Sequence, residues 1–463
     1  MIARALDRSA TIATALLGTA LLVLAVRGAV TPAPPIALDA SGTWADDGWS
    51  RGARGALLFA TGLAVLGLVR VAGPRRLLAA AVLSLAALAF AVSAAALDLT
   101  GLWAGIAFAT ALSPLAVVAA DPRRTAARHA LAVALLGGLA TGVLAVAFLT
   151  LTALAGSTHS LEIGFLVARL EDASPLALTA VRATAVAVAM LAAWAPFHLG
   201  LPELWGEGSA PLAGWLAVVW PWAGWSVIVR LSNGLFPALE DWGLDGATAV
   251  SLFLVLGAIV PASAALAEQR AGRMLALLGA GTLSELLLAV HTQGIAAASV
   301  AGGLWGYALA WVCGSAALAG ARGRAGSDAI ADLSGLARRV PRTSLALAAA
   351  VLLWAGLPGT FSLAVRWQLW QEAIAPDAGA SPFALFTVAV GGLLRVLVAA
   401  RLLQVLYFRA PAADAAIRPV LPGARVRWAI VFVVALALEF ALGLGPEVWR
   451  APLVAPGPVL RGG

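Results

Sequence analysis

The sequence is poor in charged residues, and its positive charge comes from a single residue type. Charged residues make up 11% of the 463 residues, hydrophobic residues make up 62%, and the mean hydropathy is +0.94. A soluble domain carries about 25% charged residues, so the composition excludes a soluble globular protein and indicates an integral membrane protein. The sequence contains no lysine, so all 30 basic residues are arginine, and the formal net charge is +7.

Cysteine is almost absent as well. The one cysteine, Cys313, lies in an apolar run, which excludes an intrachain disulfide and any CxxC metal or cluster site. The four histidines show no HxxxH spacing, and the one HxxE spacing, His159 with Glu162, has no second histidine near it in the sequence. No phosphate-binding or nucleophile motif falls in a polar loop. We therefore expect no metal, no cofactor and no catalytic residue, and no catalysis by the chain on its own.

Long apolar runs follow one another along the chain. A membrane-spanning helix takes about 20 residues, so the runs leave room for roughly 13 of them. The predicted fold class is therefore an all-α, multi-pass membrane protein. The expected helices cover residues 10–29, 55–72, 78–97, 99–119, 129–155, 174–198, 211–232, 247–267, 274–290, 297–320, 343–370, 382–408 and 428–446.

The arginines lie mainly in short segments between these runs, for example Arg123, Arg124 and Arg128 in one segment and Arg338 and Arg339 in another. Such segments stay on the cytoplasmic side, which predicts a cytoplasmic N-terminus in a bacterial-type inner membrane. This topology accounts for the basic balance. No polar segment combines a basic patch with interleaved aromatic residues, so we expect no nucleic-acid partner.

Two expected helices are interrupted by proline. Pro196 lies near the end of one helix, and Pro358 lies inside another. Such breaks are tolerated in membranes where protein or a water-filled cavity surrounds them. Each break falls in the fourth helix of a five-helix block, and the blocks start from opposite sides of the membrane, which indicates two inverted repeats. The chain then divides into N-terminal helices (1–77), a first repeat (78–232), a second repeat (247–408) and a C-terminal helix and tail (409–463).

Several stretches resemble, in chain order, one family of membrane subunits. Residues 196–205 read PFHLGLPELW and resemble the family segment PFHxWxPDxYxGxPxPV. Further stretches of the same family resemble residues 127–142, 273–276, 332–341, 356–366 and 406–408. The family is that of the antiporter-like subunits of respiratory complex I, and the resemblance is strongest to subunit N of NADH-quinone oxidoreductase.

The resemblance implies proton translocation along buried ionisable residues, and four such positions can be compared. The family's glutamate falls on Ala107, and two of its lysines fall on Leu191 and Pro221. Its last lysine, in the second broken helix, falls on Arg366. Arginine does not release its proton, so we expect a degenerate proton pathway. Tryptophans are expected to fill the first half-channel (Trp194, Trp215, Trp220, Trp222 and Trp225).

Other ionisable residues also lie in the expected helices. Glu285 is expensive to bury, and it has three interpretations: an ion pair with Arg366 or Arg395, a relay of its own, or a position near a wet boundary. His198 either caps the break, binds a loop or passes protons. Arg366, Glu285, Arg395 and His198 are thus the ion-pathway candidates, and Glu439 is expected to face lipid-edge water or a neighbouring subunit.

Two functions are compatible with this resemblance. The first is a structural or coupling subunit of a complex I-like assembly, an NADH:quinone oxidoreductase-like complex in which other copies do any pumping. The second is an ion-translocating subunit that uses a rewired path in a redox complex, a cation antiporter or an inorganic-carbon uptake system. In both cases the expected partners are lipid and other membrane subunits, including antiporter-like paralogues.

Overall fold

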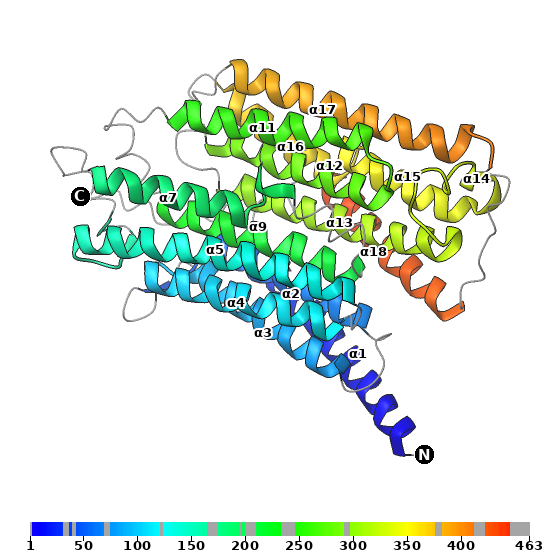
Figure 1. Ribbon diagram of the computed structural model, residues 1–463, viewed down its shortest axis with the longest axis horizontal. Coiled ribbons are helices and arrows are strands. Elements are labelled where there is room, and N and C mark those ends of the chain that lie inside the picture. Colours follow the sequence, from blue (N-terminus) through cyan, green and yellow to red (C-terminus); the bar gives the residue numbers. More distant parts are fainter. Residues whose placement is uncertain are drawn as a thin grey trace.

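The computed structural model is almost entirely helical. It describes residues 2–30, 37–38, 43–68, 75–120, 124–160, 162–163, 175–194, 196–199, 210–232, 246–290, 297–375, 382–411 and 422–444. Within these residues the only sheet is one antiparallel pair, β1 (Ala37–Leu38) with β2 (Ala45–Asp46). Figure 1 shows most helices running side by side along the long axis of the molecule.

The helices follow the chain in two groups. In Figure 1, α1 to α5 of the first group lie along the lower side, and α11 and α17 of the second group lie along the upper side. The first group is α1 (Ile2–Val30), α2 (Gly48–Gly67), α3 (Arg75–Ala95), α4 (Leu99–Ala120), α5 (Arg124–Ala155), α7 (Pro175–Leu191), the 3-10 turn η2 (Phe197–Leu199) and α9 (Ala210–Ser232). The second group is α11 (Gly246–Ala267), α12 (Ala271–Glu285), the 3-10 helix η3 (Leu286–Val290), α13 (Ala297–Ala325), α14 (Leu336–Arg339), α15 (Pro341–Ala355), α16 (Phe361–Ile374), α17 (Pro382–Leu403), the π-helix η4 (Gln404–Phe408) and α18 (Pro422–Leu444).

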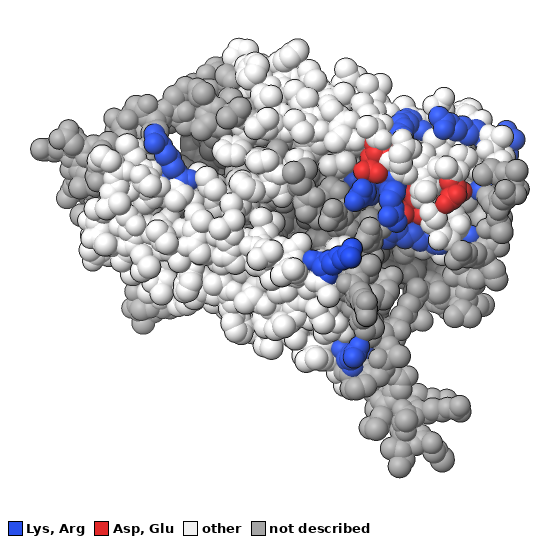
Figure 2. All heavy atoms as spheres, in the orientation of Figure 1, with Lys and Arg blue, Asp and Glu red and all other residues white. Residues whose placement is uncertain are grey.

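The chain is a multi-pass membrane protein. Among the described residues, six helical stretches are long and apolar enough to cross a membrane, and five shorter helices are also apolar. Large apolar side chains stand outward on them, such as Leu149 (70% exposed) on α5 and Phe386 (65% exposed) on α17. Figure 2 shows arginines gathered near α14, at one end of the molecule, while most of the other described atoms on this face are uncharged.

The segments that connect the helices form two sets, and the members of each set contact one another although they are distant in sequence. Trp44 forms a β-bridge with Ala96, and Asp98 forms one with His159, so the connections before α2, before α4 and after α5 lie together. A second set meets elsewhere, where Arg270 bridges Ala329. In this second set, the backbone N–H of Gly335 also donates to the carbonyl of Val405 at 3.0 Å.

The start of α2 differs from the prediction. Hydropathy predicted a helix over 55–72, whereas α2 begins at Gly48 and ends at Gly67. Its N-cap is Asp47, whose carboxylate accepts the backbone N–H of Ser50 at 2.8 Å, while the Ser50 hydroxyl accepts the backbone N–H of Asp47 at 3.0 Å. This reciprocal capping box satisfies two backbone donors. The capping box starts the helix within a stretch that contains arginines and that hydropathy therefore left outside the predicted helix.

Helix α13 joins the two groups. Its Trp305 donates from the indole nitrogen to the Gly52 carbonyl of α2 at 3.2 Å. The next residue, Gly306, lies so close to Ser362 of α16 that its carbonyl accepts the Ser362 hydroxyl at 3.2 Å. Small residues allow membrane helices to approach in this way. The helix therefore connects the first group to the second broken helix.

Candidate functional site

The second helix break is stabilised by an arginine. Gly356 (φ 97°) and Gly359 (φ 81°) turn the chain between α15 and α16 in a left-handed conformation that suits glycine. Pro358 has no N–H, so the carbonyl of Trp354, four residues earlier, has no partner within the helix. Arg366 Nη1 donates to this carbonyl at 2.9 Å. The break thus leaves a backbone carbonyl without a helical donor, and Arg366 supplies the missing hydrogen bond.

Three of the four predicted ion-pathway candidates come together beside this break. Glu285, at the C-terminal end of α12, is 3% exposed and pairs with the Nη2 group of buried Arg395 on α17. On its other side, Arg366 Nε of α16 lies 3.4 Å from Glu285 Oε2. Arg366 also donates to the Thr282 hydroxyl at 2.9 Å. One buried carboxylate therefore lies between two guanidinium groups from different helices.

The prediction for Glu439 was wrong. Its side chain faces neither lipid-edge water nor a surface of the chain, because it is 0% exposed. Glu439 Oε1 accepts the Ser362 hydroxyl at 2.7 Å, and Oε2 accepts the Ser362 backbone N–H at 2.9 Å. A carboxylate at the N-terminus of α16 is stabilised by the unpaired N–H groups and the helix dipole there. Sequence reasoning missed this contact because α18 is distant in sequence from α16.

A small cavity lies inside this charged cluster. Its volume is about 20 Å³, and its walls include Thr282, Glu285, Tyr307, Trp354, Ser362 and Arg366. This volume is enough for one water molecule. Glu285 Oε2 and Arg366 Nε form no hydrogen bond with the described residues, although they are an ion pair with each other. The cluster therefore has polar atoms able to hold water within the bundle.

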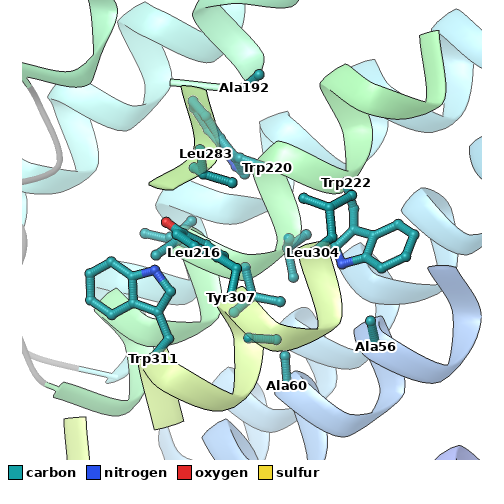
Figure 3. Packing of buried hydrophobic residues seen from close by; sticks show 14 of the residues in the cluster. Ala56, Ala60, Ala192, Leu216, Trp220, Trp222, Leu283, Leu304, Tyr307 and Trp311 are labelled. Carbon is teal, nitrogen blue, oxygen red and sulfur yellow. The ribbon is translucent and has the colours of Figure 1, made fainter. Parts of the chain in front are cut away.

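The first half of the chain is different in character. Leu191 is fully buried at the end of α7, Pro221 is buried in α9, and Ala107 is partly exposed on α4. Tryptophans pack around α9 at ring-centroid distances of 5.0 Å for Trp49 and Trp222 and 5.6 Å for Trp194 and Trp225. We call this set, with Trp215 and Trp220, the tryptophan block; Figure 3 shows Trp220, Trp222 and Leu216 in the packed interior.

The tryptophan block is held partly by hydrogen bonds. Trp215 donates to the Thr61 hydroxyl at 2.9 Å, and Trp49 donates to the Ser226 hydroxyl at 3.2 Å. Trp220 packs against Gly137 of α5, where a Cβ atom would lie 3.2 Å from the indole ring. The rings therefore fit between α2, α5 and α9.

The first helix break begins before the predicted proline. Helix α7 ends at Leu191, and Ala193 takes a left-handed conformation with φ 53°. The backbone N–H of Trp194 then bonds to the carbonyl of Ala189 at 2.9 Å, which closes the helix end as a Schellman motif. Pro196 lies beyond this turn. The helix has ended before proline can interrupt it.

His198 lies in η2, after the first break, whereas the other three candidates lie on α12, α16 and α17. It is 2% exposed, and its Nδ1 atom makes no hydrogen bond to the described residues. The structure therefore brings Glu285, Arg366 and Arg395 together and leaves His198 on a separate element.

An ion pair between the end of α9 and the N-cap of α2 ties the first group together. Arg230, at the end of α9, donates from Nη1 to Asp47 Oδ2 at 2.5 Å and from Nη2 to Asp47 Oδ1 at 3.1 Å. It also donates from Nε to the Ala94 carbonyl at 3.0 Å. Burial raises the pKa of Asp47, but the Arg230 charge and the hydrogen bonds outweigh it and lower the pKa below its usual value.

Comparison with known proteins now identifies the family. Residues 96–391 match the family model described as NADH:quinone oxidoreductase/Mrp antiporter, TM. The chain belongs to this family. The antiporter family match includes both helix breaks, Arg366 and the three positions Ala107, Leu191 and Pro221, whereas Glu439 lies beyond it.

Sequence relatives include subunit N of NADH-quinone oxidoreductase from several bacteria. Subunit N 1 of Sorangium cellulosum is 27% identical over 342 residues, which cover 70% of this chain and 65% of the relative. Subunit N of Heliobacterium modesticaldum is 32% identical over 289 residues, which cover 60% of this chain and 58% of the relative. The matches thus span somewhat less than two thirds of these two relatives.

Solved structures share the fold over nearly the whole chain. A chain of respiratory complex I from Thermus thermophilus with bound aureothin has a TM-score of 0.74 and 24% identity, covering 97% of this chain and 93% of its own. A chain of the membrane-bound sulfane sulfur reductase, an archaeal respiratory membrane complex, has a TM-score of 0.76 and 15% identity, with 97% and 95% coverage. The antiporter-like fold is therefore shared by this chain.

Proposed function

We propose that this member of the antiporter family is a membrane subunit of a multisubunit, complex I-like assembly, in which it has a structural or coupling role. Its partners are other membrane subunits, including antiporter-like paralogues, and lipid, with no nucleic acid. The solved chains that share its fold belong to respiratory membrane complexes, and its sequence relatives are named as subunits of an oxidoreductase. These likenesses support membership in an assembly of that kind.

The tryptophan block is the observation that carries the structural role. A proton relay through a membrane needs ionisable side chains and water, and the first half has no ionisable side chain at the compared positions. Leu191 and Pro221 are apolar and buried, and Trp220 lies between α9 and Gly137 of α5. The first half is therefore proposed to be a packed scaffold without a water path.

The proposed topology has 13 spanning segments, an N-terminus in the cytoplasm of a bacterial-type cell and two inverted repeats, 78–232 and 247–408. Two sets of bridged connections support alternating helix directions, one containing Trp44 with Ala96 and the other containing Arg270 with Ala329. The second set lies near the arginine-rich end seen in Figure 2, as the positive-inside rule requires of a cytoplasmic face. Residues 1–77 and 409–463 then flank the repeats.

A second candidate function is ion translocation through the second repeat alone. The observation that favours it is the cavity beside Glu285 and Arg366, because intramembrane ionisable residues beside water mark ion paths. Arginine holds its charge, so Glu285 would be the group that exchanges a proton. Arg366 and Arg395 would then position it.

Extraction of the assembly in mild detergent tests the proposed function. We expect mass spectrometry of the co-purifying proteins to detect further antiporter-like membrane subunits together with redox subunits. A matched preparation carrying Trp220→Ala should lose subunits, since α9 then packs less tightly, whereas Arg342→Gln on the exposed start of α15 should not. Recovery of the chain with no other membrane subunit would contradict the proposal.

A further inference from the structure

The C-terminal helix α18 contributes a second buried carboxylate to the charged cluster. Glu439 holds both the hydroxyl and the backbone N–H of Ser362. One turn later, Gly443 lies directly against the turn that precedes α16, where a Cβ atom would be 2.4 Å from the Thr360 carbonyl carbon and 2.5 Å from the Gly359 oxygen. This close packing fixes α18, and with it Glu439, on the second helix break.

With this carboxylate, the buried cluster contains two acids and two arginines. Glu285 and Glu439 carry the negative charges, and Arg366 and Arg395 carry the positive ones. The sum of the four formal charges is zero, which makes burial tolerable. Because arginine keeps its proton, only the two carboxylates can exchange one.

Ser362 binds Glu439 directly and lines the same cavity as Glu285. Its hydroxyl is 2.7 Å from Glu439 Oε1, and the same residue lines the cavity whose other walls include Glu285 and Tyr307. Glu285 Oε2 makes no hydrogen bond to a described residue. Buried polar atoms beside a cavity of this size are commonly satisfied by an ordered water.

We propose that one water in this cavity and the Ser362 hydroxyl form a proton-exchange link between Glu285 and Glu439. When the cluster has bound one extra proton at acidic pH and the Ser362 hydroxyl has turned from Glu439 toward the cavity, a proton on Glu439 passes to Ser362 Oγ as the Ser362 hydroxyl proton passes to the water, and the water gives a proton to Glu285. One O–H bond forms for each that breaks, and no electron moves. Reorientation of the hydroxyl and the water resets the link. Its role in transport rests on the ion-translocation candidate, but the exchange itself does not require transport.

The groups that face the link come from all the elements packed around it. Glu285 faces Arg395 of α17 and Arg366 of α16, and Tyr307 of α13 lines the same cavity. Glu439 faces α16 and α13, from which Cys313 also interacts with its charge. Both arginines remain charged, so the link exchanges its proton in a region of fixed positive charge.

Infrared spectroscopy of the detergent-extracted full-length protein in lipid nanodiscs tests the link. Protonated carboxyl groups have a distinct C=O band, and its rate of hydrogen–deuterium exchange can be followed on dilution into heavy water at acidic and neutral pH. At acidic pH, where the two carboxyl groups share one proton, we expect the band to weaken in Glu285→Gln and in Glu439→Gln. In Ser362→Ala, which keeps the backbone N–H bond to Glu439, we expect deuterium exchange to slow several-fold.

Glu372→Gln is the matched control. Glu372 is another acid of α16, bound to the Ser299 hydroxyl at 2.7 Å and to Gln368 at 2.8 Å, and its replacement should leave the exchange rate unchanged. Unchanged exchange in Ser362→Ala, or no carboxyl band lost in Glu439→Gln, would overturn the link. Proton uptake by vesicles that contain the assembly is measured separately. If the vesicles take up protons but the spectra show no exchange link, only this inference is contradicted. If the link is present but the vesicles take up no protons, only the ion-translocation candidate is contradicted.

Discussion

Removal of the Glu285 charge should destabilise the protein strongly. In wild type the two acids and two arginines of the cluster balance, and Glu285 and Arg395 are 3% and 2% exposed. Glu285→Gln leaves Arg395 as a buried charge whose nearest counter-charge is gone, and breaking a buried pair in this way costs about 3–5 kcal/mol. The neutral amide still accepts one hydrogen bond, so we expect the free energy of unfolding to fall by about 3 kcal/mol.

The double variant Glu285→Leu with Arg395→Met should recover much of this loss. Both charges of the pair are then removed, and Arg366 remains with Glu439 as a balanced pair of opposite charge. Replacement of a whole buried ion pair by apolar side chains is often neutral or stabilising. We therefore expect a coupling free energy of at least about 2 kcal/mol between the two positions.

Thermal and denaturant unfolding of the purified protein in detergent measures the cycle formed by wild type, Glu285→Leu, Arg395→Met and the double variant. The exposed Arg342→Gln substitution is the control, and it should change stability by less than about 0.5 kcal/mol. Additive effects of the two single substitutions would refute the reasoning. The cluster would then not behave as a charge-balanced unit.

Three further predictions follow from other elements. Trp220→Ala should destabilise the protein by about 3–5 kcal/mol in a denaturant titration, because it removes an indole packed against Gly137; a change below about 1 kcal/mol would show that the tryptophan block is loosely packed. Asp47→Asn should destabilise at neutral pH. The lowered pKa of Asp47 means that its contribution is complete above the unfolded value of about 4 and disappears as the pH falls through the folded value, so the difference from wild type should vanish in acid; a pH-independent difference would contradict this. Ala193→Gly should raise the melting temperature, because the left-handed conformation at φ 53° costs alanine about 1 kcal/mol; an unchanged or lower value would show that this turn carries no such strain.

The length of an apolar run predicts most helices well, because a spanning helix needs a continuous apolar segment whether its side chains contact lipid or other helices. The expected helix 382–408 coincides with α17 and η4, and 247–267 differs from α11 by one residue. The start of α2 was misplaced because it depends on the side chain of Asp47, a local hydrogen-bonding feature that hydropathy does not contain. The end of α7 was misplaced for a similar reason, since Ala193 closes the helix before Pro196.

The charged cluster was only partly predictable from the sequence. An acid inside an apolar run requires a partner, which makes Glu285, Arg366 and Arg395 recognisable without coordinates. Glu439 carries the same signal, but its partner is the N-terminus of a helix created by a break, and nothing in residue spacing shows which helix end α18 covers. The Trp354 carbonyl was in principle predictable, because Pro358 removes its usual donor.

Water access to the first half tests the central claim most directly. Cys313 is the one cysteine of the chain and is buried, so Cys313→Ala provides a background for single cysteines at Leu191 and Ala217, with the exposed Ala410 as the labelled control. Treatment of the native membrane assembly with a small thiol reagent should label position 410 and leave positions 191 and 217 unlabelled. Rapid labelling at 191 or 217 would show a water path through the tryptophan block and would contradict the scaffold role.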